Sequence, residues 1–277
     1  MLRAVNGIRI NVLDEGEGHP VVFLHGLGGC WRDWEPQLDH LRDRYRCIVI
    51  EHRGHGRSER CTGEYSTDLF AADAAAVLAQ LGVGHAYVVG LSMGGMIAQK
   101  LALAEPDLVE ALVLCDTGTH MGRRTTDYLV AAGREIRDHG FPDSRGAVRV
   151  EGSAFSRWTV EHQPHVARSN MREAEANDPD CWARAALAVA RHDTRDGIGR
   201  ITAPTLVVWG EEDQAVPLKL AQPLVDALGG AQLVVLADAG HVCNLDQPAA
   251  FEAAVEEFFG ANPCRATPAG PTPPPAP

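Results

Sequence analysis

Basic side chains, long apolar runs and paired cysteines are all scarce in this sequence of 277 residues. Its 25 Lys and Arg are outnumbered by 37 Asp and Glu, which gives a formal net charge of −12. A surface of this sign repels the phosphates of nucleic acids and of anionic lipids, so we expect neither a nucleic acid nor a membrane as partner. No apolar run reaches the ~20 residues that a membrane-spanning helix needs.

The seven cysteines form no C-x-x-C pair, and their number is odd. Both features are typical of reduced thiols and argue against a secreted disulfide framework. Residues 1–16 also lack the uninterrupted apolar core of a signal peptide. We therefore predict a cytoplasmic protein, and the sequence does not indicate its oligomeric state.

Metal and nucleotide motifs are missing as well. His52 and His55 are three positions apart, and so are His162 and His165, but neither pair has a third ligand at a useful spacing. The chain has no G-x-G-x-x-G and no P-loop lysine. We expect no metal and no cofactor, and a small molecule as the partner.

Short apolar runs recur along the chain, and helical patterns separate them. The runs predict strands buried on both faces, at residues 21–24, 47–50, 86–89, 111–114, 205–209 and 232–236. Helices are predicted at residues 33–41, 67–81 with Thr67 as the cap, 93–104 and 248–259. This alternation implies an α/β fold, with a mostly parallel central sheet flanked by helices.

The alternation stops between Gly118 and Gly197, where the sequence indicates several helices. A second domain is one interpretation, but the alternation resumes afterwards. We therefore predict a helical lid, residues 118–197, inserted after the strand at residues 111–114, which we expect to be the sixth strand of the complete sheet. The core then consists of residues 1–117 and 198–261. Residues 262–277 are rich in proline and favour an extended, disordered tail.

The pentapeptide G-L-S-M-G at residues 90–94 matches the pattern G-x-S-x-G. It directly follows a predicted buried strand and directly precedes a predicted helix, which is the setting of a nucleophile elbow. Glycines suit the two outer positions because the sharp turn leaves little room for side chains. The turn raises Ser92 above the strand ends, where ligands bind in open α/β sheets. Ser92 is thus the predicted nucleophile.

A serine hydroxyl needs a general base, and the base needs an orienting acid. His241 comes just after the last predicted strand, at the edge of the sheet where Ser92 is expected. Asp213 follows the preceding strand and is the favoured acid. Asp116, after the strand at residues 111–114, is the alternative acid.

The developing oxyanion requires two backbone N–H donors. Met93, one residue after the nucleophile, is the first candidate. Leu27, in the glycine-rich loop H-G-L-G-G at residues 25–29, is the second, because the glycines let the backbone approach a substrate closely.

As a set, these motifs resemble the α/β-hydrolase superfamily. The similar stretches are H-G-L-G at residues 25–28, R-G-H-G-R-S at 53–58, the pentapeptide at 90–94, G-x-x-D at 210–213 and G-H at 240–241. The resemblance implies the triad Ser92, Asp213 and His241 in that order, and a structural role for residues 53–58, including a buried His55. Dehalogenases and epoxide hydrolases of this superfamily have Asp in place of Ser92, so neither is expected as a primary activity.

Three stretches are similar to the 3-oxoadipate enol-lactonase group, namely residues 111–117, residues 181–186 followed by 192–196, and residues 240–248. This resemblance implies hydrolysis of a small ester or lactone through an acyl-enzyme, with 3-oxoadipate enol-lactone as a candidate substrate. A serine-dependent perhydrolase, a carbon–carbon bond hydrolase and a hydrolase-fold ligand receptor with little turnover are the alternatives.

Three lid residues are predicted to contact the substrate. Trp158 and Trp182 offer large rigid surfaces suited to a pocket wall, or else they pack the lid helices together. Arg157 is a candidate partner for a substrate carboxylate through a bidentate pair, although an exposed arginine is the alternative.

Overall fold

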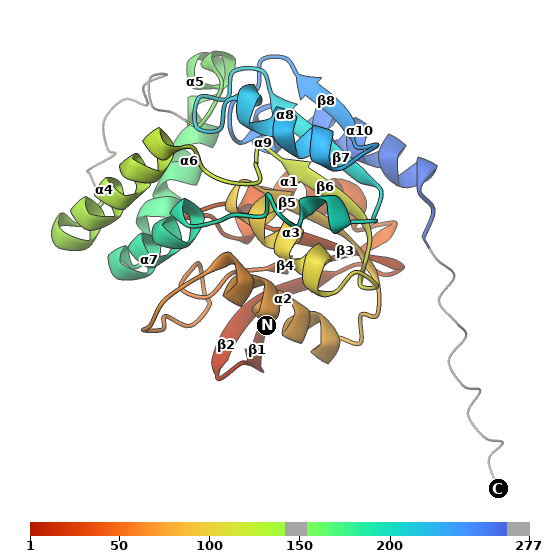
Figure 1. The fold of residues 1–277 in the computed structure, drawn as a ribbon, viewed down its shortest axis with the longest axis horizontal. Coiled ribbons are helices and arrows are strands. Elements are labelled where there is room, and N and C mark those ends of the chain that lie inside the picture. The colour runs from red at the N-terminus through yellow and green to blue at the C-terminus, as the bar shows by residue number, and fades with distance from the viewer. Residues whose placement is uncertain (142–153, 265–277) are drawn as a thin grey trace, which may run out of the picture.

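The computed structural model describes residues 1–141 and 154–264 of the chain (Figure 1). The predicted disordered tail, residues 262–277, lies outside the described residues from 265 onward, and so does part of the predicted lid, residues 142–153. Within the described start of the tail, the backbone carbonyl of Asn262 accepts a hydrogen bond from the Tyr87 hydroxyl at 2.7 Å.

Eight strands form one sheet in the order β1-β2-β4-β3-β5-β6-β7-β8. They are β1 (Leu2–Val5), β2 (Ile8–Glu15), β3 (His19–Leu24), β4 (Tyr45–Ile50), β5 (Ala86–Leu91), β6 (Val109–Cys115), β7 (Thr205–Gly210) and β8 (Gln232–Leu236). β1 and β2 pair antiparallel, and β2 is antiparallel to β4. All other neighbours are parallel, so the predicted mostly parallel sheet is confirmed.

Helices cover both faces of this sheet, which explains its apolar central strands. One core packs α2 (Thr67–Gln80), α3 (Met93–Ala104) and α8 (Leu218–Ala227) against one face. A second core packs α1 (Glu35–Leu41) and α10 (Pro248–Ala261) against the other. Every residue of β5 and β6 is buried, as expected of parallel strands covered on both sides.

Two details of the predicted helices are wrong. The helix expected at residues 33–41 is divided, because a 3-10 helix, η1 (Trp31–Trp34), precedes α1. Thr67 is not the cap of α2. Ser66 caps that helix, since its Oγ accepts the backbone N–H of Leu69 at 3.1 Å.

Among the described residues, four α-helices lie between β6 and β7, and they lie together at one side of the sheet (Figure 1). They are α4 (Arg123–His139), α5 (Arg157–His162), α6 (Pro164–Glu175) and α7 (Pro179–Ala190). The name lid is kept here for residues 118–197. The lid is tied to the core by Asn177, whose Nδ2 donates to the carbonyl oxygen of Gly28 at 2.7 Å. Two short elements, η2 (Ile198–Arg200) and α9 (Cys243–Asp246), follow in the core.

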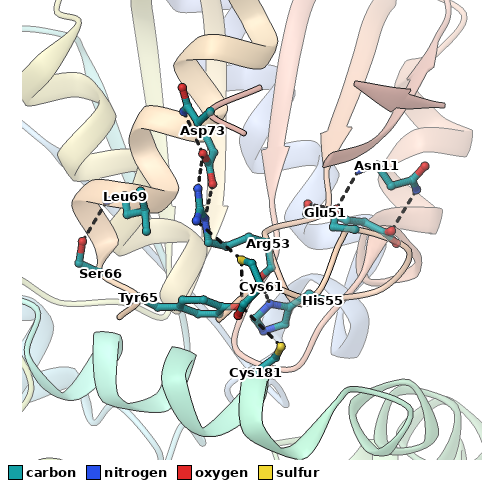
Figure 2. A network of polar contacts seen from close by, with 12 residues as sticks. Asn11, Glu51, Arg53, His55, Cys61, Tyr65, Ser66, Leu69, Asp73 and Cys181 are labelled. Atoms are coloured by element: carbon teal, nitrogen blue, oxygen red, sulfur yellow. Dashed lines mark hydrogen bonds and ion pairs between the residues drawn. The ribbon is translucent and has the colours of Figure 1, made fainter. Parts of the chain in front are cut away.

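Within the R-G-H-G-R-S stretch, residues 53–58, Arg53 and His55 are buried and belong to a polar network after β4 (Figure 2). The Arg53 guanidinium donates to both carboxylate oxygens of Asp73, at 2.6 and 2.7 Å. His55 is buried, and its Nδ1 lies 3.1 Å from the carbonyl oxygen of Arg53. These contacts agree with the structural role that the resemblance implies for this stretch.

Candidate active site

Ser92 occupies a strained turn between β5 and α3. Its φ of 52° and ψ of −114° lie in a region that residues with side chains rarely adopt. The flanking glycines are required by space: a Cβ on Gly94 would overlap the carbonyl oxygen of Leu24, and one on Gly90 would overlap that of Gly94. The turn is fixed by the backbone N–H of Ser92, which donates to the carbonyl oxygen of Cys115 at 2.8 Å.

His241 lies between the predicted nucleophile and the predicted acid. Its Nε2 is 2.8 Å from Ser92 Oγ, and its Nδ1 is 2.9 Å from Asp213 Oδ2. The other oxygen of Asp213 accepts the backbone N–H groups of Ala215 and Val216, at 2.8 and 3.0 Å. The Asp213 side chain is fully buried, so its orientation toward His241 is well supported.

The ionisation of His241 is governed by opposing effects. Burial lowers its pKa, whereas the negative charge and hydrogen bond of Asp213, with the charge of Asp116, raise it. The net result is a pKa of about 9. The imidazolium form, which would arise when the imidazole takes a proton from Ser92, is thus favoured by its surroundings.

Asp116, the alternative acid, is held by other partners. Its Oδ1 accepts the backbone N–H of Gly210 at 2.8 Å, and its Oδ2 accepts that of Cys243 at 3.4 Å. Burial, together with the charge of Asp213, raises its pKa to about 8. The geometry therefore favours Asp213 as the residue that orients His241, with Asp116 nearby as a second buried carboxyl.

A cavity of about 310 Å³ opens above Ser92 and His241. Most of its wall is apolar, with contributions from Met96, Met121, Leu129, Trp182, Val189 and Val216. Leu27, a predicted oxyanion donor, also lines it. Met93, the other predicted donor, begins α3 directly after Ser92. The oxyanion roles of both residues stay predictions.

The structure places only one of the three predicted lid contacts in this cavity wall. Trp182 lines the cavity. Trp158 is 37% exposed and stacks on His162, with 5.1 Å between ring centroids. Arg157 is exposed, and its backbone N–H donates to Glu212. Neither belongs to the described wall.

The rotation of α5 explains where Arg157 and Trp158 lie. Its buried residues are Thr159 and Val160, so Arg157 and Trp158 at the start of the helix face away from the interior. Ser156 sets the start of the helix, because its Oγ accepts the backbone N–H of Thr159 at 3.2 Å. A single six-residue helix has too little periodicity in sequence for this phase to be predicted.

The wall also contains a pair of polar residues that no sequence motif indicates. Asp33 of η1 and Asn170 of α6 both line the cavity, and Asn170 Nδ2 donates to Asp33 Oδ1 at 2.9 Å. Asp33 lies within a predicted helix, and Asn170 lies within the predicted lid. No signal in the sequence marks them as neighbours.

Histidines gather beside this region without forming a metal site. The rings of His25, His52 and His55 are buried, and the centroids of His52 and His55 lie 4.3 and 5.2 Å from that of His25. Burial lowers the pKa of each, so these rings are neutral and structural. Within residues 1–141 and 154–264 no group of three His, Cys, Asp or Glu could hold a metal ion.

No described helix is long and apolar enough to span a bilayer.

Comparison with known proteins decides the family. The model of a family described as the alpha/beta hydrolase fold matches residues 19–248. The chain belongs to this family. As an α/β hydrolase it is 33% identical over 255 residues to a Mycobacterium tuberculosis protein described as non-heme bromoperoxidase BpoC, covering 89% of this chain and 95% of that protein.

Two solved α/β-hydrolase structures are similar along nearly the whole chain. The enol-lactonase from Burkholderia xenovorans has a TM-score of 0.87 and 28% identity, covering 94% of this chain and 100% of that one. A thermophilic esterase from Thermogutta terrifontis has a TM-score of 0.84 and 28% identity, covering 94% and 96%. The expected superfamily and fold are thereby confirmed.

Proposed function

We propose that this α/β hydrolase is a serine hydrolase that cleaves a small ester or lactone through an acyl-enzyme. The observation that carries the proposal is the continuous set of contacts from Asp213 through His241 to Ser92, at 2.9 and 2.8 Å, at the base of a cavity. A nucleophile in hydrogen-bonding reach of a base, with the base held by an acid, is the arrangement that nucleophilic catalysis requires.

In the proposed reaction, His241 Nε2 takes the proton of Ser92 as Oγ attacks the carbonyl carbon. The backbone N–H groups of Leu27 and Met93 are the proposed donors to the oxyanion. The carbon–oxygen bond then breaks, and His241 returns the proton to the leaving alkoxide. A water molecule, deprotonated by His241, attacks the acyl-enzyme and releases the acid and free Ser92.

The cavity supports a small, largely apolar substrate. Its volume of about 310 Å³ is at the low end for small-molecule sites. Within the described part of the chain, its wall contains neither Lys nor Arg. With Arg157 outside that wall, the carboxylate contact expected for 3-oxoadipate enol-lactone lacks support. The names of the similar structures, an enol-lactonase and an esterase, support the ester and lactone class.

A perhydrolase activity is the second candidate, because the 33% identical relative is described as a bromoperoxidase. In that reaction hydrogen peroxide replaces water and attacks the acyl-enzyme, which yields a peracid and free Ser92. A ligand receptor with little turnover is less well supported, since binding alone does not require the contacts among Ser92, His241 and Asp213.

The setting of the proposed reaction follows from charge and cysteine chemistry. All seven cysteines are free thiols, which supports a reducing compartment such as the cytoplasm. The net charge of −12 supports a small molecule rather than a nucleic acid as the partner.

The test is hydrolysis of p-nitrophenyl esters and lactones by the purified chain, with and without hydrogen peroxide. Ser92→Ala should abolish turnover, with a loss in kcat on the order of 10⁶. Ser169→Ala, at an exposed serine of α6, is the matched control and should retain it. Turnover by Ser92→Ala at the wild-type rate would exclude the proposed nucleophile.

A further inference from the structure

Asp33 and Asn170 form a hydrogen-bonded polar pair in the wall of the cavity above Ser92. Asp33 belongs to the core and Asn170 to the lid, so the pair joins the two segments. A second cavity, of about 510 Å³, lies on the other side of the pair, between η1, α1 and α6. Of the described residues, only Asp33 and Asn170 line both cavities.

The Asp33 carboxyl has acceptor capacity beyond its internal contacts. Asn170 Nδ2 donates to Oδ1, and a backbone hydrogen bond from Cys30 also reaches the carboxyl group. A carboxylate offers about four lone-pair positions, so two internal donors leave it able to accept from a further group. The side chain is only 3% exposed, and a bound molecule would meet it with little competing water.

The surroundings of Asp33 do not neutralise its charge. Burial, opposed by these two hydrogen bonds, and the charges of Glu173 and Glu51 raise its pKa to about 7. Among the described residues, Arg32 is the one arginine or lysine that lines the second cavity, and its Nε is 3.2 Å from Glu173 in an ion pair. Above pH 7 the catalytic cavity therefore contains a buried negative charge that a hydrogen-bond donor would stabilise.

We propose that Asp33, supported by Asn170, is a specificity-determining subsite that selects esters or lactones carrying an N–H or O–H donor and discriminates against those carrying a carboxylate. This inference rests on the proposed hydrolase function and names its substrate class. The N–H or O–H group of the substrate donates to the Asp33 carboxylate in place of water. A substrate carboxylate instead meets a like charge in a region of low dielectric. Ser92 would act on the ester carbonyl as before.

The alternative is that the pair only braces the lid against the core. A brace would affect binding of all substrates alike, whereas a subsite changes the ratio between matched substrates. The test therefore uses two pairs of p-nitrophenyl esters. One pair ends in a secondary acetamide or in its N-methyl analogue, which lacks the donor. The other ends in a carboxylate or in its methyl ester.

For wild type at pH 8, kcat/KM should favour the secondary amide over its N-methyl analogue by ~10- to 100-fold, the range of a charged hydrogen bond. The methyl ester should be favoured over the carboxylate to a similar degree. In Asp33→Asn both preferences should shrink at least ~5-fold, because the charge is gone while the shape is kept. Glu35→Gln removes the same charge from the neighbouring exposed position, outside the catalytic cavity, and should leave both ratios within ~2-fold.

A wild-type experiment covers the case in which Asp33→Asn does not fold. Raising the pH from about 6 to 8 ionises Asp33, so the preference for the methyl ester over the carboxylate should grow. Titration of His241 affects both esters equally and cancels in the ratio of their kcat/KM values. The other charged groups facing this region are Arg32, Glu35, Asp39, His165 and Glu173 of the second cavity, with Glu51. His165→Gln removes the one histidine among them, and the trend should persist in that variant.

The outcomes separate the two proposals. The enzyme could hydrolyse the esters with substrate preferences that change neither with pH nor in Asp33→Asn. That result would overturn the subsite and leave the hydrolase function intact. Equal losses of kcat/KM in Asp33→Asn for both esters of each pair would identify a brace and would also overturn the subsite. Absence of hydrolysis of all four esters by folded wild type contradicts the hydrolase function itself, and the subsite with it.

Discussion

Nε2 of His241 lies 2.8 Å from Oγ of Ser92, although 149 positions separate them in the chain. The contact exists because β5 and β8 are parallel strands of one sheet, so the loops that follow them meet at the same edge. Asp213 follows β7, between these strands in the sheet order, and reaches the same edge. Sheet topology alone therefore brings the three residues together.

The two candidate acids can be separated by matched substitutions. Asp213→Asn should lower kcat by a factor on the order of 10⁴, because the amide no longer holds His241 in the required tautomer. Asp116→Asn should lower it by less than ~10-fold, since Asp116 Oδ1 accepts a backbone N–H that the amide oxygen can also accept. Steady-state kinetics on one neutral p-nitrophenyl ester measure both. The reverse order of effects would make Asp116 the catalytic acid.

The pH dependence follows from the raised pKa of His241. The proposed general base must be neutral, so kcat/KM for a neutral ester should rise with pH and reach half its maximum near pH 9. Asp116→Asn removes one of the charges that raise this pKa, and the midpoint should move to lower pH. A profile that is flat from pH 6 to 9 would contradict the assignment of His241 as the titrating base.

The same shift predicts a change in stability. Folding raises the pKa of His241 above the ~6.5 of an exposed histidine, so the folded state favours the protonated form. This contribution to the free energy of unfolding is complete below about pH 6.5 and is lost as the pH rises through about 9. Urea denaturation of wild type and His241→Gln at several pH values should give curves that converge as the pH increases.

The glycines of the nucleophile turn allow a direct test of its geometry. Gly94→Ala places a methyl group against the backbone carbonyl of Leu24, which cannot move without disturbing β3, so both stability and activity should fall sharply. Gly84→Ala is the control, because a Cβ there meets nothing within 4 Å. Thermal unfolding should show a lowered Tm for the first variant alone, and equal Tm values would mean that the turn is less crowded than described.

The sequence predicts the fold and the position of the candidate site. The strand-and-helix alternation and the motifs around Ser92, Asp213 and His241 were sufficient to place the predicted site, because residues that follow parallel strands share one sheet edge. The prediction of Leu27 and Met93 as oxyanion donors rests on the same motifs.

The lid is different, because its helices contact the cavity through side chains whose direction depends on how each helix is rotated against the core. Arg157 and Trp158 were chosen by residue type and face outward, whereas Asp33 and Asn170 were missed and lie in the wall. They come together only through packing of α6 on η1.

Trp182 and Trp158 provide the last prediction, since one tryptophan of the lid lines the cavity and the other does not. The Trp182 indole lies against Gly28, where a Cβ would be 3.0 Å from its Nε1, and so limits the space beside the loop that carries Leu27. Trp182→Ala should therefore enlarge the cavity and change acyl-chain preference. We expect kcat/KM for p-nitrophenyl octanoate to rise relative to the acetate by ~10-fold, because each methylene that becomes buried contributes about 0.8 kcal/mol.

Trp158→Ala serves as the control for Trp182→Ala, because Trp158 is 37% exposed and stacks on His162 outside the described wall. Its octanoate-to-acetate ratio should remain within ~2-fold of wild type, and its Tm should change little. Comparing the two ratios removes any general effect of losing an indole from the lid. If Trp158→Ala changes chain-length preference as much as Trp182→Ala does, the cavity wall is not the origin of that preference, and the selecting role of Trp182 is wrong.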